Sequence, residues 1–209
     1  VRYLRANAGV VITASHNPSH DNGYKVYFND GAQVVEPHAS GIIAKVNAAD
    51  TTAPNENRGS VTTLNREVDN AYLTRLETLV LDPELVRAQN ALRIVFTPIH
   101  GTGGVIIKPL LERLGFKFDV VPEQDNFDGR FPTVQSPNPE NAEALRLGIE
   151  LAEKNEADLV IATDPDCDRM GVAVRSHDGE MQLLSGNQIG SLIAYYRAQK
   201  LFEQWVLTH

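Results

Sequence analysis

Cysteine is almost absent from this sequence, which has one, Cys167, among 209 residues. A single cysteine cannot form a disulfide within the chain, and this is typical of proteins in a reducing cytosol. No apolar run approaches the ~18 residues that a membrane-spanning helix needs. No charged start followed by an apolar stretch indicates a signal peptide. We therefore expect a cytoplasmic protein without a membrane partner.

Positive charge is also scarce. The 19 Lys and Arg residues are outnumbered by 27 Asp and Glu residues, which gives a net charge of −8. This balance argues against a nucleic-acid partner, and an anionic ligand would need a local basic pocket. Hydrophobic residues make up 42% and charged residues 22%, as in ordinary soluble globular proteins. The length allows one large or two modest domains.

A polar loop near the start of the chain joins two predicted strands. An apolar run at residues 10–12 is typical of a buried strand, and residues 25–28 are typical of a second one. Between them stand Ser15 and His16, followed by turn signals at Pro18 and at residues 22–23. A serine beside a histidine on a tight loop is suited to chemistry. The alternative is an ordinary surface turn, which uses the same residue types.

An acidic loop follows the predicted buried strand at residues 159–163. Its alternate carboxylates could converge on one hard cation through oxygen ligands; they are Asp164, Asp166 and Asp168. An EF-hand is excluded, because the places that need Gly and Glu hold Arg169 and Arg175. A solvated acidic turn is the remaining alternative. Within this loop we interpret Cys167 as a small filler, since no His-paired thiol signature surrounds it.

Strands and helices alternate along the rest of the chain, which predicts an α/β fold with mixed, largely parallel sheets flanked by helices. The glycine turn at residues 100–104, between a strand and a helix, is either a phosphate cradle or a structural turn. A helix capped by Asn138 should begin at Pro139. The Thr-, Pro- and Asn-rich stretch at residues 50–59 is the best candidate linker, and residues 205–207 should begin a further strand.

Several motifs together resemble the alpha-D-phosphohexomutases. Residues 13–18 with Asn22, Gly23 and Lys25 are similar to the phosphoserine loop of that family. Residues 164–169 are similar to its metal loop, and the two loops occur in the family's order. Further similar motifs lie at residues 96–104, 131–133, 136–140 and 185–188. These further motifs favour the phosphoglucomutase and phosphopentomutase branch over the phosphomannomutase branch.

The resemblance covers nearly the whole chain and implies repeated, structurally similar domains. Residues 1–58 would be the C-terminal part of domain I with the phosphoserine loop. Residues 59–180 would be domain II with the metal-binding loop, and residues 181–209 the start of domain III. The chain also lacks an initiator Met. We therefore expect an incomplete chain that alone does not carry out the full reaction.

The resemblance also implies an activity, namely transfer of phosphate between the 1- and 6-positions of a hexose, glucose above all. Ser15 would carry the phosphoryl group and pass through a bisphosphate intermediate. One Mg²⁺ would be held by the three aspartates and by an oxygen on Ser15. Arg169 would bind phosphate oxygens. Lys25 is our preferred base and His16 our preferred substrate contact, with the opposite assignment open.

The implied small molecules are a sugar phosphate substrate and a glucose 1,6-bisphosphate-type activator. Phosphomannomutase and phosphopentomutase are alternatives within the family. Two alternatives from other classes are a serine hydrolase and a non-catalytic metal-binding fragment. The hydrolase is disfavoured, since no Gly-x-Ser-x-Gly elbow is present and it leaves the three-aspartate loop unexplained. The sequence gives no indication of oligomeric state.

Overall fold

The computed structural model describes residues 1–50 and 59–204. They form two compact units: residues 1–13 with residues 22–50 and 59–65, and residues 14–21 with residues 66–204. Residues 51–58 of the expected linker and the strand expected at 205–207 lie outside the described residues. No helix in the described part of the chain is long and apolar enough to cross a membrane.

The first unit contains an antiparallel pair of strands and one helix. β1 (Ala8–Thr13) pairs with β2 (Gly23–Phe28), and α1 (His38–Asn47) follows. The strand predicted at residues 10–12 is present within β1, but its predicted burial is wrong, because Val10 is 60% and Ile12 74% exposed. The strand forms because the β1–β2 ladder satisfies its backbone. Its side chains stay exposed because no second layer of this unit, within the described residues, covers them.

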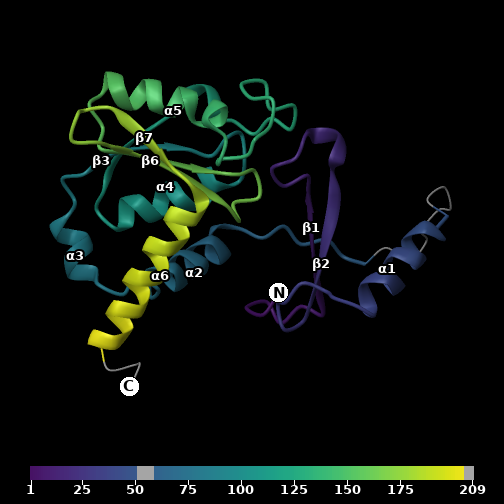
Figure 1. The fold of residues 1–209 in the computed structure, drawn as a ribbon. Helices are drawn as coiled ribbons and strands as arrows, with labels where there is room; N and C mark the ends of the chain where they lie inside the picture. The colour runs from purple at the N-terminus through teal and green to yellow at the C-terminus, as the bar shows by residue number, and fades with distance from the viewer. Residues whose placement is uncertain (51–58, 205–209) are drawn as a thin grey trace. The chain divides into compact units, whose positions relative to one another are not determined.

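A mixed five-stranded sheet forms the centre of the second unit (Figure 1). Its strand order is β4-β3-β5-β6-β7. The strands are β3 (Arg93–Thr97), β4 (Lys117–Val120), β5 (Leu159–Thr163), β6 (Met170–Arg175) and β7 (Met181–Leu184). β4, β3 and β5 are parallel, whereas β6 and β7 continue the sheet antiparallel through two short connections. The predicted α/β class, a mixed sheet flanked by helices, is confirmed.

Helices cover both faces of this sheet (Figure 1). α5 (Ala142–Lys154) packs on one face against Val95 and Val160, which belong to the larger core cluster. The opposite face presents Phe96 to α4 (Gly103–Arg113), whose Leu111 completes a second cluster. Strands buried on both faces are typically near-continuous apolar runs, as β3 and β5 are.

The remaining helices lie around this centre. α2 (Arg66–Glu77) buries Leu73 and leaves Tyr72 53% exposed. α3 (Pro83–Ala88) was not predicted. Short 3₁₀ turns occur at Ser19–Asp21 and Pro122–Gln124. α6 (Gly186–Glu203) begins with a capping box formed by Ser185 and Gln188, which lie in the motif at residues 185–188.

The start of α5 differs from the prediction. The helix begins at Ala142 after Asn141, not at Pro139 after Asn138. Asn138 does use its side-chain oxygen as a cap would, accepting from the Glu140 amide at 3.0 Å, but this closes a local turn. An Asx turn and a helix cap use the same local pattern, so the sequence alone does not separate them.

Leu145 provides a test of the α5–sheet core, because it is fully buried there. Leu145→Ala should lower the free energy of unfolding of the 209-residue chain by about 2–5 kcal/mol, since the cavity adds to the lost burial. Val105→Ala on α4 is the matched control, because Val105 is 46% exposed and should change stability by less than about 1 kcal/mol. Denaturant unfolding of both variants measures this, and equal midpoints would contradict the packing described.

Candidate functional site

The candidate site lies where two neighbouring parallel strands end. β3 and β5 are paired in parallel, so the loops after Thr97 and Thr163 leave the same edge of the sheet. Thr102 joins the two loops, because its amide and its hydroxyl donate to the Pro165 carbonyl at 2.8 and 3.0 Å. Ligand sites of α/β sheets characteristically lie outside the carboxyl ends of strands. The Thr102 amide thus already donates a hydrogen bond within the protein and is not available to a phosphate. This favours the interpretation of residues 100–104 as a structural turn over a phosphate cradle.

Three carboxylates converge in the second of these loops. Asp164, Asp166 and Asp168 each offer an oxygen, and these oxygens lie within 4.8 Å of one another. Asp164 is fully buried, and its Oδ1 accepts from the amides of Asp168 (3.0 Å) and Arg169 (2.9 Å). Burial above all, together with the neighbouring Asp166 carboxylate, raises the pKa of Asp164 to about 6, against the opposite effect of the Arg169 amide. The cluster therefore holds negative charge at an unfavourable spacing.

This donor set fits a hard divalent cation. Mg²⁺ prefers carboxylate oxygens and is usually held by one or two of them together with water and phosphate. Asp164 Oδ1 is taken by two amides, which leaves Oδ2 directed towards the cluster, and Asp166 is only half-buried. The cluster therefore offers carboxylate oxygens to a cation and leaves one side of the cation accessible. A site that a phosphoryl group shares needs such an accessible side.

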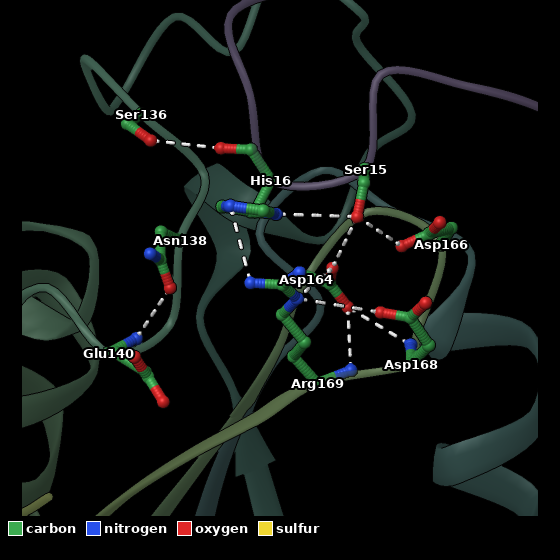
Figure 2. Close-up of polar contacts among 9 residues, drawn as sticks. All are labelled: Ser15, His16, Ser136, Asn138, Glu140, Asp164, Asp166, Asp168 and Arg169. Atoms are coloured by element: carbon green, nitrogen blue, oxygen red, sulfur yellow. Dashed lines mark hydrogen bonds and ion pairs between the residues drawn. The ribbon is translucent and has the colours of Figure 1, made fainter. Parts of the chain in front are cut away.

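Ser15 lies against this cluster (Figure 2). Its Oγ is 3.3 Å from Oδ2 of Asp164 and 3.3 Å from Oδ1 of Asp166. Ser15 adopts a left-handed backbone conformation, with φ of 52°. Non-glycine residues adopt this conformation uncommonly, and it is most often held by its surroundings at functional loops. The structure thus brings together residues 149 and 151 positions apart in the chain.

The hydrogen bonds of His16 determine its tautomer. Arg169 Nη1 is 3.2 Å from His16 Nε2, and an arginine can only donate, so Nε2 must accept. A neutral His16 then carries its proton on Nδ1, which is 3.4 Å from Ser15 Oγ and donates to it. In this arrangement His16 orients the serine oxygen and does not take its proton.

The same geometry argues against a serine hydrolase. In a catalytic triad the histidine accepts the serine proton, and a carboxylate binds its other nitrogen. Here an arginine binds the other nitrogen of His16, so the polarity of the ring is reversed. Arg169 also lies 3.7 Å from Asp168 and 4.0 Å from Asp164, measured from its Nε, and remains 45% exposed. Its guanidinium is thus held at the edge of the cluster, where it could meet an anion.

Two other residues of the sequence analysis lie elsewhere or serve another purpose. Lys25 is on β2 opposite Val11, in the first unit, so its predicted role as base stays a prediction. Cys167 is half-buried in the acidic loop with φ of 61°. Burial raises the pKa of its thiol, which disfavours the reactive thiolate.

Sequence reasoning missed a buried polar network behind the site. Thr97, His100 and Gln124 are almost fully buried, and they meet Thr133 in one set of hydrogen bonds. Ser136, three residues beyond Thr133, donates to the His16 carbonyl at 2.9 Å. Ser136 lies in the motif at residues 136–140, but the sequence assigned no role to this residue. Gln124 lies in the 3₁₀ turn Pro122–Gln124, and nothing in the sequence distinguishes this buried glutamine from an exposed one.

Fold and site together define a three-layer α/β domain with an acidic cluster and a serine at its strand ends. Residues 70–179 match the family model "Phosphoglucomutase/phosphomannomutase, alpha/beta/alpha domain II", and residues 1–53 match the corresponding model for domain I. The chain belongs to the phosphoglucomutase/phosphomannomutase family, as the resemblance implied.

Three relatives illustrate this membership. A phosphoribomutase of Saccharomyces cerevisiae is 39% identical over 94% of this chain and 35% of its own length. A phosphoglucomutase of Staphylococcus aureus is 39% identical over 96% of this chain and 37% of its own. A crystal structure from Thermus thermophilus, provisionally named a phosphomannomutase, has a TM-score of 0.74 and 26% identity over 95% of this chain and 43% of its own. The chain thus spans less than half the length of these relatives.

Proposed function

We propose that this chain supplies the phosphorylated serine and the metal-binding loop of a phosphohexomutase that interconverts hexose 1-phosphate and hexose 6-phosphate, most often glucose phosphates. The observation that carries the proposal is the position of Ser15 Oγ, 3.3 Å from carboxylates of both Asp164 and Asp166. A serine hydroxyl has one proton and can donate to only one of these two carboxylates at a time. A serine that carries a phosphoryl group would gain a shared cation.

The proposed reaction consists of two phosphoryl transfers. In the first, the P–O bond of phosphorylated Ser15 breaks and a substrate hydroxyl oxygen binds the phosphorus, giving a hexose bisphosphate. In the second, Ser15 Oγ takes the other phosphoryl group, which leaves the isomeric monophosphate. The protons that leave the attacking hydroxyls go to a base, for which we propose Lys25. A glucose 1,6-bisphosphate-type activator would phosphorylate Ser15 at the outset.

Each remaining residue has a proposed role in this reaction. Mg²⁺, held by the three aspartates and an oxygen on Ser15, would act as a Lewis acid on the transferred phosphoryl group. Arg169 would bind phosphate oxygens with its planar guanidinium. His16 would orient Ser15 through Nδ1–H and contact substrate. These residues act by position and charge, which is how most catalysis of phosphoryl transfer arises.

The proposed division of the chain follows the family's domains. Residues 1–58 would be the C-terminal part of domain I, residues 59–180 domain II, and residues 181–209 the start of domain III. In this arrangement the chain contributes the chemical groups. The parts that grip the sugar would come from elsewhere in a longer protein.

A pentose phosphate is the second candidate substrate. The relatives named phosphoribomutase and phosphoglucomutase are both 39% identical to this chain, so identity over these residues favours neither sugar. A mannose phosphate is the third, because the similar Thermus thermophilus structure is named for it. All three substrates would share the serine and the acidic cluster described here.

A substrate panel tests the proposal. The protein at its natural length, with Mg²⁺ and catalytic bisphosphate, would be given glucose, mannose and ribose 1-phosphates in separate coupled assays. We expect turnover with the glucose compound at least about tenfold above the others, a difference of ~1.4 kcal/mol in transition-state binding. Preference for ribose or mannose would change the substrate assignment. Absence of any isomerisation would support the non-catalytic metal-binding alternative.

A further inference from the structure

We propose that Ser136 is a positioning residue for Ser15, and that the bridging segment, residues 133–140, is the rigid support through which it acts. The inference rests on the proposed function, because Ser15 is the group being positioned. Ser136 Oγ donates to the His16 carbonyl at 2.9 Å, one residue after Ser15 (Figure 2). The hydrogen bond therefore fixes the His16–Asn17 peptide, one peptide beyond the left-handed Ser15.

The first end of the bridging segment is anchored by the buried polar network. Thr133 Oγ1 accepts from Gln124 Nε2 at 3.1 Å and lies 2.9 Å from His100 Nε2. His100 Nδ1 lies 3.2 Å from the carbonyl of Asn126, so Nδ1 carries the proton and Nε2 accepts from the Thr133 hydroxyl. Each side-chain nitrogen and oxygen named in this set thus has a hydrogen-bond partner, and such a buried network is rigid.

The network continues to the end of β3. Gln124 Oε1 accepts from the Thr97 hydroxyl at 2.6 Å, and Thr97 Oγ1 accepts from the Ile99 amide at 3.1 Å. Thr97 is the last residue of β3 and is fully buried. The network therefore holds Thr133 in place relative to the end of β3, at the same edge of the sheet from which the acidic loop leaves.

The second end of the bridging segment is held by close packing. Pro139 lies so close to Gly171 of β6 that a Cβ added there would overlap the Pro139 carbonyl. The Glu140 carboxylate lies at the first residue of α6, where a Cβ on Gly186 would overlap it. Pro137 and Pro139 are both fully buried. A side chain at Gly171 would displace the Pro139 backbone, so the close approach requires glycine there, whereas at Gly186 the overlap involves only the flexible end of the Glu140 side chain.

The rigid bridging segment contacts the loop of Ser15 through the Ser136 hydroxyl. This contact therefore sets the distance between Ser15 and the carboxylates. The carboxylates belong to the other loop, which Ser136 does not touch in any described hydrogen bond. Loss of the Ser136 hydroxyl should therefore misplace the nucleophile and leave in place the three aspartates, which supply most of the proposed cation ligands. Displacements of about 1 Å near reacting groups can lower rates by about 100-fold.

The test uses Ser136→Ala, with Ser136→Thr as the conservative rescue, in the protein at its natural length. We expect Ser136→Ala to lower kcat by about 10- to 100-fold, with KM and Mg²⁺ affinity within about twofold of the original protein. Ser136→Thr, which keeps the hydroxyl, should restore kcat to within about threefold. Ser176→Ala is the matched control, because the buried Ser176 hydroxyl has no hydrogen-bond partner within the described residues.

Three results would overturn the inference. The first is a kcat of Ser136→Ala within twofold of that of the original protein. The second is a parallel loss of Mg²⁺ affinity and melting temperature, which would indicate a general structural role. The third is failure of Ser136→Thr to restore activity. Ser15→Ala, measured beside these variants, separates the two proposals. Activity retained in Ser15→Ala would refute the phosphoserine mechanism itself, whereas its loss together with an unaffected Ser136→Ala would refute the positioning role alone.

Discussion

Replacing Ser15 with alanine should abolish isomerisation in the protein at its natural length, lowering kcat by about 10⁴-fold or more. Removal of a covalent nucleophile has effects of this order, because no neighbouring group takes over its bond. Here the carboxylates facing Ser15 Oγ at 3.3 Å would repel an incoming phosphoryl group without the cation. They would therefore make poor substitutes. Coupled assays with bisphosphate present measure the loss.

The same variant should lose the mass increment of one phosphoryl group. Intact mass before and after phosphatase treatment would show the increment in the original protein and not in Ser15→Ala. Ser19→Ala is the matched control, since Ser19 is exposed in the short 3₁₀ turn of the same loop. It should keep both the increment and the activity. An alanine variant at position 15 that turns over normally would refute the covalent relay.

Much of the fold was predictable because its signals are local. The apolar runs of β3 and β5 predict buried strands, and the capping box of Ser185 and Gln188 predicts the start of α6. The alternation of carboxylates from Asp164 to Asp168 predicts a cluster from strand geometry and turn chemistry alone. These features depend on residues within a few positions of one another.

The failures came from contacts between distant segments. The apolar run at residues 10–12 predicts a strand correctly, but its burial depends on what packs against it, and Ile12 is 74% exposed. Asn138 and Asn141 have the same capping chemistry, and tertiary packing decides which one precedes α5. The role of Ser136 depends on a carbonyl 120 positions away. No local pattern contains that information.

Mg²⁺ should stabilise the 209-residue chain, and Asp166→Asn should remove most of this effect. Three carboxylates with oxygens within 4.8 Å of one another repel when no cation is bound, so binding relieves a cost present in the folded state. At 100 times its dissociation constant, a ligand that binds only the folded chain stabilises it by about 2.7 kcal/mol. For a chain of this length that corresponds to a rise in Tm of roughly 5–10 °C.

The expected signature of Asp166→Asn has two parts, both measured by thermal melts with and without Mg²⁺. Without the ion, the variant should melt at or above the temperature of the original chain, because one repulsive charge beside the buried Asp164 is gone. With the ion, its rise in Tm should be less than about half that of the original chain, because an amide oxygen holds a hard cation more weakly than a carboxylate. Asp178→Asn, in the exposed turn between β6 and β7, is the matched control and should keep the full rise. An Asp166→Asn variant with the full Mg²⁺ response would move the cation site away from this cluster.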